Sequence, residues 1–493
     1  MKRPRNRKVM TSRWVFAVKD VMHENNSITE KAKARLVVRG FQQVPGVDFY
    51  ETFAPVAKFT TVRAVLAAVA KFDLELHQMD VKTAFLNGEL EEDIYMEVPD
   101  GVKVDNSADV VCKLKKAMYG LKQASRQWNI KIDEFLVNYL GFEKCVGDAC
   151  LYIRRDEKAK TLMIIVLYVD DLLLAGNSMQ GIKWMKRELN NKFEMKDLGE
   201  ASMCLGFEIS RNRNARKLFL GQERYAEKVL ERFRMSQCYS VPIPMENVRD
   251  LEKRLESKSV QPDLCDAPYR EAIGSLMYLM IGTRPDIAFA VSKLSRYLDC
   301  AEQKHWNAVK RVLRYVKGTK DFGICFDGTK DIMPVGYSDS DWAGDVNDRK
   351  STGGYVFTMC GGPISWSSRK QSVVATSSCE AEYIALCAAC KEAIWVMKIV
   401  SPLIKITEVG KSVTIFSDSQ SAIALSLTEA VNRRNKHIAI TYHFVREVVD
   451  DGRVKLEYIP TKNMLADTMT KPLGRVKFQG LREVSGIFGK GEF

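Results

Sequence analysis

The sequence predicts an α+β protein built from several domains, and three observations lead to this. The chain has 493 residues, more than one ordinary hydrophobic core organises, so two to four domains are expected. Short apolar runs rich in branched residues, typical of buried strands, mix with amphipathic helical stretches up to about residue 198. Helical stripes then dominate to about residue 330, and short strands alternating with helices follow to about residue 473.

Composition and charge narrow the class of partner. With 46% hydrophobic and 28% charged residues, the chain has the composition of a folded, soluble protein. Its net charge of +13 indicates a polyanionic partner, either nucleic acid or an acidic membrane surface. The apolar runs are too short to span a bilayer, and we recognise no signal peptide or lipidation motif. The basic segment 1–11 is expected to be a solvated tail, although a nucleic-acid-binding or targeting arm has a similar composition.

The cysteines indicate a reducing, intracellular compartment. Twelve are scattered along the chain, mostly in apolar segments, without the density of a disulfide scaffold. Cys387 and Cys390 form a CxxC inside a predicted helix, with His437 and His443 downstream. A zinc site is one hypothesis, and buried helical cysteines are the favoured interpretation.

The first elements predict a hairpin. A strand at residues 14–18, a polar turn near residues 25–26 and the run KAKARLVVRGF at residues 31–41 form it. Lys33 and Arg35 are two positions apart, so in a strand they share a face. Two cations on one face can hold a triphosphate, but spacing alone favours ordinary surface charge.

A helix, a strand and a second helix are expected next. Thr60 or Thr61 is placed to cap a helix that runs to about residue 71. A strand then ends at Asp80, and the turn after it carries Phe85. The second helix is expected to end with Gly141 as its C′ residue. One face of that helix is apolar, with Ile132, Phe135, Leu136 and Tyr139.

Residues 161–177, TLMIIVLYVDDLLLAGN, predict a buried hairpin with Asp170 and Asp171 at its tip. Adjacent carboxylates beside an apolar core are costly, because like charges repel and desolvation adds to the penalty. A divalent cation would offset both costs, whereas an exposed turn is the plain alternative. Asp80, a third carboxylate at the end of an apolar strand, favours the cation. Three such groups could hold two Mg²⁺ ions.

The rest of the chain changes pattern twice. A helix at about residues 179–191 precedes helical stripes flanked by basic residues, which suit a nucleic-acid backbone as well as any solvated face. Residues 240–268 are polar, include Pro242, Pro244 and Pro262, and predict a linker. The last region predicts strands at residues 334–339, 354–359, 364–368, 372–376, 413–417 and 454–459, and helices from residue 380 and at residues 419–427 and 436–449.

Four carboxylates in this last region again sit at strand ends or helix starts. They are Asp339, Glu382, Asp418 and Asp467. Such a set in one α/β unit suggests a second two-metal phosphodiester site. Helix capping explains Asp418 and Glu382 equally well from periodicity alone.

The motifs, in their order, resemble one family. They are KARLVVRGF, ETFAPVAKFTTVR, MDVKTAFLNGELEEDIYMEVPDG, YGLKQASRQW, YVDD, SLMYLMIGTRPDIAFAVSKLSRY, SDSDWAGD, STGGYVF and CEAEYIAL. Together they resemble the Pol polyprotein of copia-type LTR retrotransposons, in its reverse transcriptase and ribonuclease H regions. The resemblance extends from about residue 12 to about residue 473.

The resemblance implies a role for each polymerase residue. Asp80, Asp170 and Asp171 would be the catalytic metal ligands. Phe85 would be the aromatic gate that excludes a 2′-hydroxyl and so selects dNTPs. Lys33, Arg35 and Gln123 would bind substrate, the two cations at the triphosphate and the glutamine near template and nucleotide.

For the ribonuclease H half, the resemblance implies catalytic and metal-binding roles for Asp339, Glu382, Asp418 and Asp467. Asp341 and Glu380 are close neighbours that could be confused with Asp339 and Glu382. Asp339 is preferred for its TDGS-like setting, and Glu382 because the segment 377–382 aligns with a family segment that ends on its glutamate.

The fold implied by the resemblance is a right-hand polymerase with fingers, palm and thumb, followed by a ribonuclease H-like α/β domain. Its expected boundaries are a basic tail at 1–11, fingers and palm at 12–198, and thumb and helical connection at 199–330. The ribonuclease H-like domain follows at 331–473 and a C-terminal tail at 474–493.

The implied activity is RNA-directed DNA polymerase with ribonuclease H, using two Mg²⁺ per site, with Mn²⁺ as a substitute. Expected partners are an RNA template, a DNA primer, RNA–DNA hybrid and dNTPs, together with Gag and integrase but no membrane. The expected location is cytoplasmic, in a virus-like particle, or nuclear. Because no Gag, protease or integrase motif is seen, a catalytically inactive, nucleic-acid-binding relic of a fragmentary insertion is the alternative.

Overall fold

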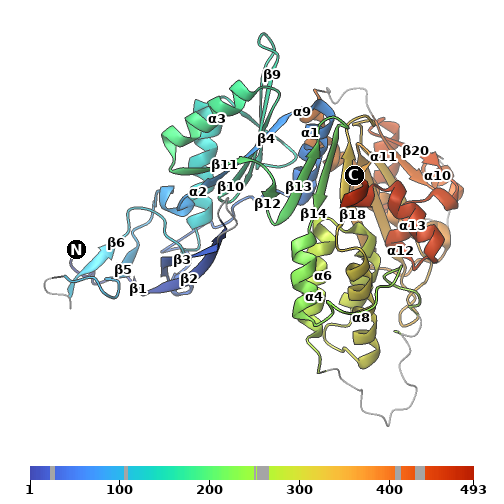
Figure 1. Cartoon of the computed structure of the whole chain (residues 1–493), viewed down its shortest axis with the longest axis horizontal. Coiled ribbons are helices and arrows are strands. Elements are labelled where there is room, and N and C mark those ends of the chain that lie inside the picture. Colours follow the sequence, from blue (N-terminus) through green and yellow to red (C-terminus); the bar gives the residue numbers. More distant parts are fainter. Residues whose placement is uncertain (23–27, 105–108, 249–250, 252–265, 406–411, 428–438) are drawn as a thin grey trace. The chain divides into compact units, whose positions relative to one another are not determined.

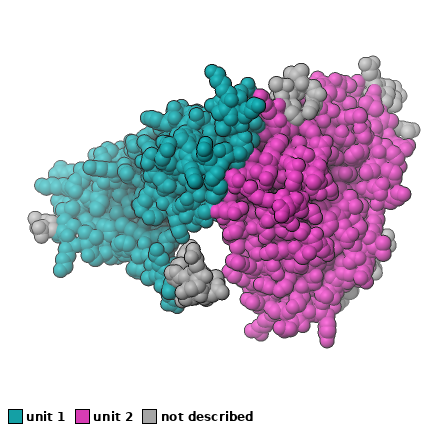
Figure 2. Space-filling view, turned by 45° about the horizontal axis from the view of Figure 1, so that its top comes forward, with its two compact units in different colours: residues 1–57, 77–144, 149–199 teal, residues 58–76, 145–148, 200–493 magenta. Residues whose placement is uncertain are grey.

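The computed structural model describes residues 1–22, 28–104, 109–248, 251, 266–405, 412–427 and 439–493. The chain forms two compact units, and neither is one continuous stretch (Figure 2). Unit 1 comprises Met1–Ala57, His77–Lys144 and Ala149–Gly199, and unit 2 comprises Lys58–Leu76, Cys145–Asp148 and Glu200–Phe493. Both contain helices and sheets (Figure 1), which confirms the predicted α+β, multidomain class. No described helix is long and apolar enough to cross a membrane.

Unit 1 is built on a six-stranded sheet with the strand order β11-β4-β10-β9-β8-β7. Its strands are β4 (Glu75–Val81), β7 (Glu143–Lys144), β8 (Leu151–Asp156), β9 (Thr161–Tyr168), β10 (Asp171–Gly176) and β11 (Met195–Glu200). β9 and β10 pair antiparallel, and the apolar run from Leu162 to Leu167 is buried. The hairpin predicted around the two adjacent aspartates is therefore confirmed.

The helices of unit 1 are α2 (Ala124–Glu134) and α3 (Met179–Lys192). α2 continues into a π-helical turn, η4 (Phe135–Tyr139), and Gly141 follows with φ 67°, as expected of a C′ residue. Ile132 and Leu136 are buried, but Tyr139 is 76% exposed, so its placement on the apolar face is wrong. The wider π turn rotates residue 139 out of the stripe that α-helical spacing predicts.

Residues 1–11 are folded, so the prediction of a solvated tail is wrong. β1 (Val9–Met10) pairs in parallel with β5 (Tyr95–Glu97), which also pairs with β6 (Val111–Lys113). The N-terminal ammonium donates to the carbonyl oxygen of Val111 at 2.8 Å, and Arg3 pairs with Glu97 at 2.7 Å. Met10 is buried in a small apolar cluster. Partners distant in sequence thus fix a segment that looks unstructured by its own composition.

A long hairpin, β2 (Ser12–Met22) with β3 (Ile28–Val38), follows β1 and precedes η1 (Gly40–Gln42). Lys33 lies opposite Ala17 and Arg35 opposite Val15, so the two cations share one face as predicted. The polar turn expected near residues 25–26 lies outside the described residues.

The first helix of unit 2 is α1 (Phe59–Phe72), and the prediction that Thr60 or Thr61 caps it is wrong. The cap is Asp148, whose Oδ2 accepts hydrogen bonds from the Lys58 amide at 3.0 Å and the Thr61 hydroxyl at 2.6 Å. The capping carboxylate is distant in sequence, where no local pattern reveals it.

Arg63 fastens α1 to two later elements of unit 2. Its buried guanidinium donates to the carbonyl oxygens of Ile281, Gly282 and Ile364 at 2.7–2.8 Å. It also lies 4.0 Å from the ring centroid of Trp366. Hydrogen bonds to three carbonyls compensate for the desolvation of this charge.

A five-stranded sheet of unit 2 has the order β12-β13-β14-β15-β21. Its strands are β12 (Met203–Cys204), β13 (Phe207–Asn212), β14 (Lys217–Gly221), β15 (Phe322–Asp327) and β21 (Ile487–Gly489). The prediction of helices joined by loops after residue 199 misses these strands. The C-terminal tail predicted at 474–493 is likewise wrong, because α13 (Arg475–Val484) buries Phe478 and Leu481, and β21 completes the sheet before η8 (Lys490–Glu492).

Helices surround a second apolar core in unit 2. They are α4 (Glu223–Arg232), α6 (Tyr269–Gly282), η5 (Pro285–Ile287), α7 (Ala288–Ser295) and α8 (Gln303–Gly318). The apolar stripes predicted for α4 and α8 lie in this core, with Val229, Leu313 and Val316 buried. Most of the predicted linker 240–268 lies outside the described residues.

The α/β pattern predicted for the last region is met by a sheet whose order is β18-β17-β16-β19-β20. Its strands are β16 (Val335–Ser340), β17 (Thr352–Met359), β18 (Gly362–Lys370), β19 (Val413–Ser417) and β20 (Val454–Tyr458). The first three pair antiparallel, and β16, β19 and β20 pair parallel. The helices are α9 (Ser378–Ile404), α10 (Gln420–Leu427), α11 (Ala439–Asp450) and α12 (Asp467–Thr470), with η7 (Thr461–Asn463) before α12. The predicted helix at 436–449 falls partly outside the described residues.

The strand predicted at residues 372–376 is wrong. Val373 and Val374 are about half exposed, and the segment is a loop that begins α9. The Glu380 carboxylate accepts from the amide of Thr376 at 2.7 Å, and the Ser377 hydroxyl accepts from the Glu380 amide at 3.2 Å. Ser377 thus caps α9 and the Glu380 carboxylate holds the residue before the cap, and together these bonds outweigh the strand preference of the two valines.

One buried ion pair offers a test of this core. The guanidinium of Arg284 lies 2.8 Å from Asp286, both side chains are almost fully buried, and the Tyr315 hydroxyl donates to Asp286 at 2.7 Å. We expect Asp286→Asn to destabilise the core by about 3–5 kcal/mol, because it leaves a buried guanidinium without its counter-charge. Urea denaturation followed by circular dichroism measures this.

The matched control is Asp299→Asn, which removes an exposed partner of Arg270 at a similar distance of 2.7 Å. That loss should be about 0–1 kcal/mol. Equal effects of the two substitutions would contradict the importance of burial.

Candidate active sites

The first site lies at the tip of the β9–β10 hairpin. Tyr168 and Asp171 are register partners, so Val169 and Asp170 form a two-residue turn. Val169 has φ 58°, a conformation that a β-branched residue rarely adopts and that costs on the order of 1–3 kcal/mol. The indole of Trp128 on α2 donates to the Val169 carbonyl oxygen at 2.6 Å and holds the strained turn in place.

The neighbouring strand β4 brings Asp80 beside this turn. The Val81 amide donates to the Asp170 carbonyl oxygen at 2.9 Å, and the Gln78 side chain donates to Asp171 Oδ1 at 3.1 Å. Burial, and then the negative charges of Asp170 and Asp80, raise the pKa of Asp171 against the effect of the Gln78 hydrogen bond. The three predicted carboxylates therefore share one electrostatic environment.

Phe85 and Arg35 meet at Tyr119, a residue that the sequence analysis did not single out. Phe85, in η2 (Ala84–Asn87), lies 4.9 Å from the Tyr119 ring, and Arg35 lies 5.9 Å from it. Burial and the charge of Asp170 raise the pKa of Tyr119, while Arg35 opposes them. Tyr119 thus contacts Phe85 and Arg35 and is close enough to Asp170 to be affected by its charge. Its motif, YGLKQASRQW, was the available signal, and it also contains Trp128.

The backbone next to Tyr119 explains how it is held there. Its carbonyl oxygen accepts from the Val38 amide at 2.8 Å. The next residue, Gly120, has φ 96°, and a Cβ there would lie 2.0 Å from the Val38 carbonyl oxygen. Only glycine permits this approach, which sets Tyr119 against β3, the strand of Lys33 and Arg35.

Gln123 lies fully buried just before α2. Its amide accepts from Gln43 at 2.9 Å and donates to the Asp48 carbonyl oxygen at 2.8 Å and to Glu92 at 3.2 Å. These bonds hold its side chain within the protein, so it shapes the neighbourhood of α2. Lys33 is exposed on β3, two residues before Arg35 on the same face of the strand.

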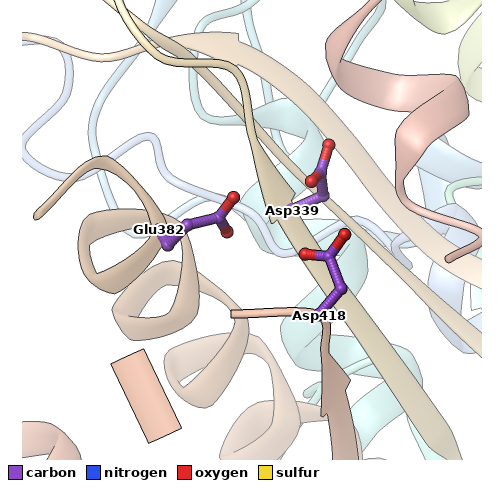
Figure 3. Close-up of side chains that lie close together, drawn as sticks. All are labelled: Asp339, Glu382 and Asp418. Carbon is purple, nitrogen blue, oxygen red and sulfur yellow. The ribbon is translucent and has the colours of Figure 1, made fainter. Parts of the chain in front are cut away.

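The second site lies in unit 2, where Asp339, Glu382 and Asp418 converge (Figure 3). Asp339 is on β16, Glu382 is in the first turns of α9 and Asp418 directly follows β19. One carboxylate oxygen from each lies within 4.8 Å of the others, and Asp339 is buried. Parallel pairing of β16 with β19 brings the two aspartates to the same sheet edge.

This cluster is electrostatically unfavourable by itself. Burial, and then the charges of Asp339 and Asp418, raise the pKa of Glu382 to about 9. Burial likewise raises the pKa of Asp339 to about 6, against the positive charge of Lys471. Glu382 Oε2 is buried and lacks a hydrogen-bond partner among the described residues. An unsatisfied carboxylate oxygen beside two others fits a hard divalent cation such as Mg²⁺.

Asp467 does not join this group of three. It begins α12, is fully buried, and its carboxylate pairs with Lys471 at 2.6 Å and also with Lys477. Lys471 lies 3.4 Å from Asp339 as well, so one ammonium connects Asp467 to the cluster. Sequence reasoning missed both lysines, because a short loop and α13 carry them and no motif marked them.

The two residues that could be confused with site residues have other contacts. Glu380 belongs to the cap of α9 described above. Asp341 is held by the Thr352 amide, and burial raises its pKa to about 6. Neither is a member of the carboxylate group, although Asp341 lies two residues beyond Asp339.

Cys387 and Cys390 are buried in α9 and unpaired in disulfides, consistent with the favoured interpretation. Among the described residues, the group that could hold a metal ion consists of Asp339, Glu382 and Asp418, and it contains no cysteine. His437, proposed as a further ligand, lies outside the described residues.

Metal binding at the acidic cluster is directly testable. At neutral pH, Glu382→Gln should leave the metal-free melting temperature nearly unchanged, because a carboxyl with a pKa of about 9 is already uncharged. Mg²⁺ at a concentration a hundredfold above its Kd should stabilise the protein that retains Glu382 by about 2.7 kcal/mol, and Glu382→Gln should abolish this gain. Thermal denaturation with and without Mg²⁺ measures both.

Asp170→Asn Asp171→Asn should be present in every sample of that test, so that the first site contributes no ion. Asp299→Asn serves as the control for an acidic residue of unit 2 outside the cluster. Retention of the Mg²⁺ stabilisation by Glu382→Gln would show that Glu382 is not a ligand.

Comparison with known proteins identifies the family. The family described as "Reverse transcriptase (RNA-dependent DNA polymerase)" matches residues 1–247. The chain is 44% identical over 489 residues to the "Retrovirus-related Pol polyprotein from transposon TNT 1-94" of Nicotiana tabacum, covering 98% of this chain and 36% of that protein. It is 37% identical over 483 residues to the corresponding polyprotein from transposon RE2 of Arabidopsis thaliana, covering 97% and 32%. The chain thus spans about a third of the length of these relatives.

Solved structures resemble parts of the chain more weakly. A prototype foamy virus protease–reverse transcriptase covers 93% of this chain and 50% of its own, with a TM-score of 0.22 and 12% identity. The N-terminal RNase H domain of a Mycobacterium tuberculosis protein covers 31% and 98%, with a TM-score of 0.23 and 13% identity. Scores this low carry no argument. On the sequence matches, the chain belongs to the reverse transcriptase family of copia-type retrotransposon Pol polyproteins.

Proposed function

We propose that the chain is an RNA-directed DNA polymerase with ribonuclease H activity, which copies RNA into DNA and degrades the RNA of the resulting hybrid. The observation that carries the proposal is the presence of two separate carboxylate sites, one in each compact unit. Each site gathers like charges at the ends of sheet strands, an arrangement that a divalent cation stabilises. Two such sites match the two reactions of the proposed function.

At the first site, Asp80, Asp170 and Asp171 would hold two Mg²⁺ ions. Bound there, the metal ions supply charge neutralisation for the attacking 3′-hydroxyl and the leaving pyrophosphate. The protein holds the aspartates with the Trp128-anchored turn, so that their geometry is set before substrate arrives.

The substrate-binding residues of this site act around Tyr119. Lys33 and Arg35 share a strand face and would hold the triphosphate of a dNTP. Phe85, packed on Tyr119, would close the space that a ribose 2′-hydroxyl needs. Gln123 would support this pocket through its buried hydrogen bonds.

At the second site, Asp339, Glu382 and Asp418 would bind Mg²⁺ directly, and Asp467 would contribute from α12. When bound, the metal supplies activation of a water and stabilisation of the scissile phosphate. The carboxylates orient both, and the raised pKa of Glu382 limits the negative charge that the cluster has to carry.

The proposed partners are an RNA template, a DNA primer, their hybrid and dNTPs, with Gag and integrase as further retrotransposon products. The net charge of +13 suits polyanionic partners, and binding should weaken steeply with salt. Fingers and palm at 12–198, thumb and connection at 199–330 and a ribonuclease H-like domain at 331–473 remain the proposed functional division.

Two assays on the full chain separate the reactions. We expect dTTP incorporation on poly(rA) with an oligo(dT) primer to require Mg²⁺ and to vanish in Asp170→Asn Asp171→Asn, because the ligands of the first site lose their charge. That variant should retain cleavage of RNA in an RNA–DNA hybrid. Asp339→Asn should show the opposite pattern, with incorporation retained and cleavage lost by a factor of about a hundred or more.

Asp156→Asn in unit 1 and Asp299→Asn in unit 2 are the controls, since both side chains are exposed and outside the two sites. Folded, hybrid-binding protein without either activity would contradict the proposal and support a non-catalytic, nucleic-acid-binding relic. Loss of both activities in either site variant would contradict the assignment of one reaction to each site.

A further inference from the structure

Lys471 occupies an unusual place for a lysine. It follows α12 directly, and its ammonium lies 2.6 Å from Asp467 Oδ1 and 3.4 Å from Asp339 Oδ2. The ammonium therefore lies between one member of the acidic cluster and Asp467.

The negative charge of the Asp467 carboxylate is balanced by two lysines. Lys471 approaches one of its oxygens and Lys477, from α13, approaches the other. Lys471 is four residues after Asp467, so the short helix α12 itself sets their separation. A cation that approaches the Asp467 carboxylate therefore meets the charge of Lys471 or Lys477 first.

Asp339 divides its carboxylate between two neighbourhoods. Toward Glu382 and Asp418 it contributes to the cluster whose oxygens lie within 4.8 Å, where Glu382 Oε2 lacks a partner. Toward α12, its Oδ2 accepts from the Thr470 hydroxyl and lies near Lys471. One cation position therefore lies among the three acidic residues, and a second lies between Asp339 and Asp467, where the ammonium sits.

We propose that Lys471 is a resident cation that competes with the second divalent ion of this site. The inference rests on the proposed ribonuclease H function and adds the order in which the two metal ions bind. One ion binds to Asp339, Glu382 and Asp418 with the lysine in place. A second ion binds only when the ammonium withdraws from between Asp339 and Asp467, because two cations cannot share that position.

The structure provides a place for the displaced side chain. A cavity of about 290 Å³ is lined by Lys471 together with Thr470, Asp341 and Lys293. This volume exceeds the roughly 30 Å³ that one water occupies in the liquid, so an ammonium and several waters fit. The wall carries the Asp341 carboxylate, on which Arg296 and Lys293 act more strongly than Lys471, and the cations Lys293 and Arg349. The displaced ammonium would therefore be stabilised mainly by water in this cavity.

A purely structural ion pair is the competing explanation, and the two differ in the sign of one effect. If Lys471 only supports α12, removing it disturbs Asp467 and weakens metal binding. If it competes with an ion, removing it strengthens binding of the second ion and leaves the first unchanged. Affinity for each ion, measured without any catalytic turnover, therefore separates them.

The test counts Mn²⁺ ions bound to the full chain by titration calorimetry and by electron paramagnetic resonance of free Mn²⁺. All samples carry Asp170→Asn Asp171→Asn, so that only the unit 2 site is counted. We expect one ion to bind tightly and a second about tenfold or more weakly in this background. Lys471→Met should tighten the second ion by about tenfold or more without changing the first.

Two matched variants complete the design. Lys471→Arg keeps the charge and should leave the second ion weak, whereas Lys462→Met removes an exposed lysine in η7 and should change neither ion. Lys471→Gln replaces the Met variant if circular dichroism shows that the latter does not fold.

An unchanged or weaker second ion in Lys471→Met, relative to Lys462→Met, would overturn the inference while leaving the nuclease proposal intact. If Asp339→Asn does not weaken the first ion, the acidic cluster is not the metal site. That result would overturn the ribonuclease H proposal together with the inference.

Discussion

Like-charged carboxylates at the ends of buried strands are the constraint on which both units depend. Desolvation and mutual repulsion oppose each cluster, so the surrounding structure has to hold groups together that would separate in water. In unit 1 the hairpin turn is strained at Val169 and fastened by Trp128. In unit 2 the sheet edge and α9 bring the acidic residues together, and Lys471 offsets part of their charge.

The sequence was sufficient wherever structure follows from local pattern. The run from Leu162 to Leu167 predicts β9 because a continuous apolar stretch of branched residues is typical of a strand that is buried on both faces of a sheet. The strand predicted at residues 413–417 has the same first and last residues as β19. Asp170 and Asp171 could be recognised because they closely follow this apolar run. The order of the motifs along the chain, and not their spacing, indicated what each site residue would do.

Long-range contacts explain what the sequence did not reveal. Asp148 caps α1, and the N-terminal ammonium binds Val111, through neighbours that no local window contains. β21 completes a sheet that begins nearly 300 residues earlier, a pairing beyond any periodicity argument. The placement of Asp467 differs most. Its position at a helix start was predicted, but the two lysines that pair with it depend on the fold of the C-terminal residues.

The path of the chain has a consequence for how this protein can be divided. The backbone passes from one unit to the other near residues 57, 76, 144, 148 and 199, and α1 belongs to the unit whose main part begins at Glu200. Arg63 on α1 completes bonds to carbonyls beyond residue 280. A nuclease fragment cut at residue 331 would lack α1 and other parts of its own unit, and a polymerase fragment ending at 198 would carry α1 without the rest of unit 2. Modular exchange of these activities would thus require transplanting interleaved segments, and proteolytic separation would yield incomplete pieces.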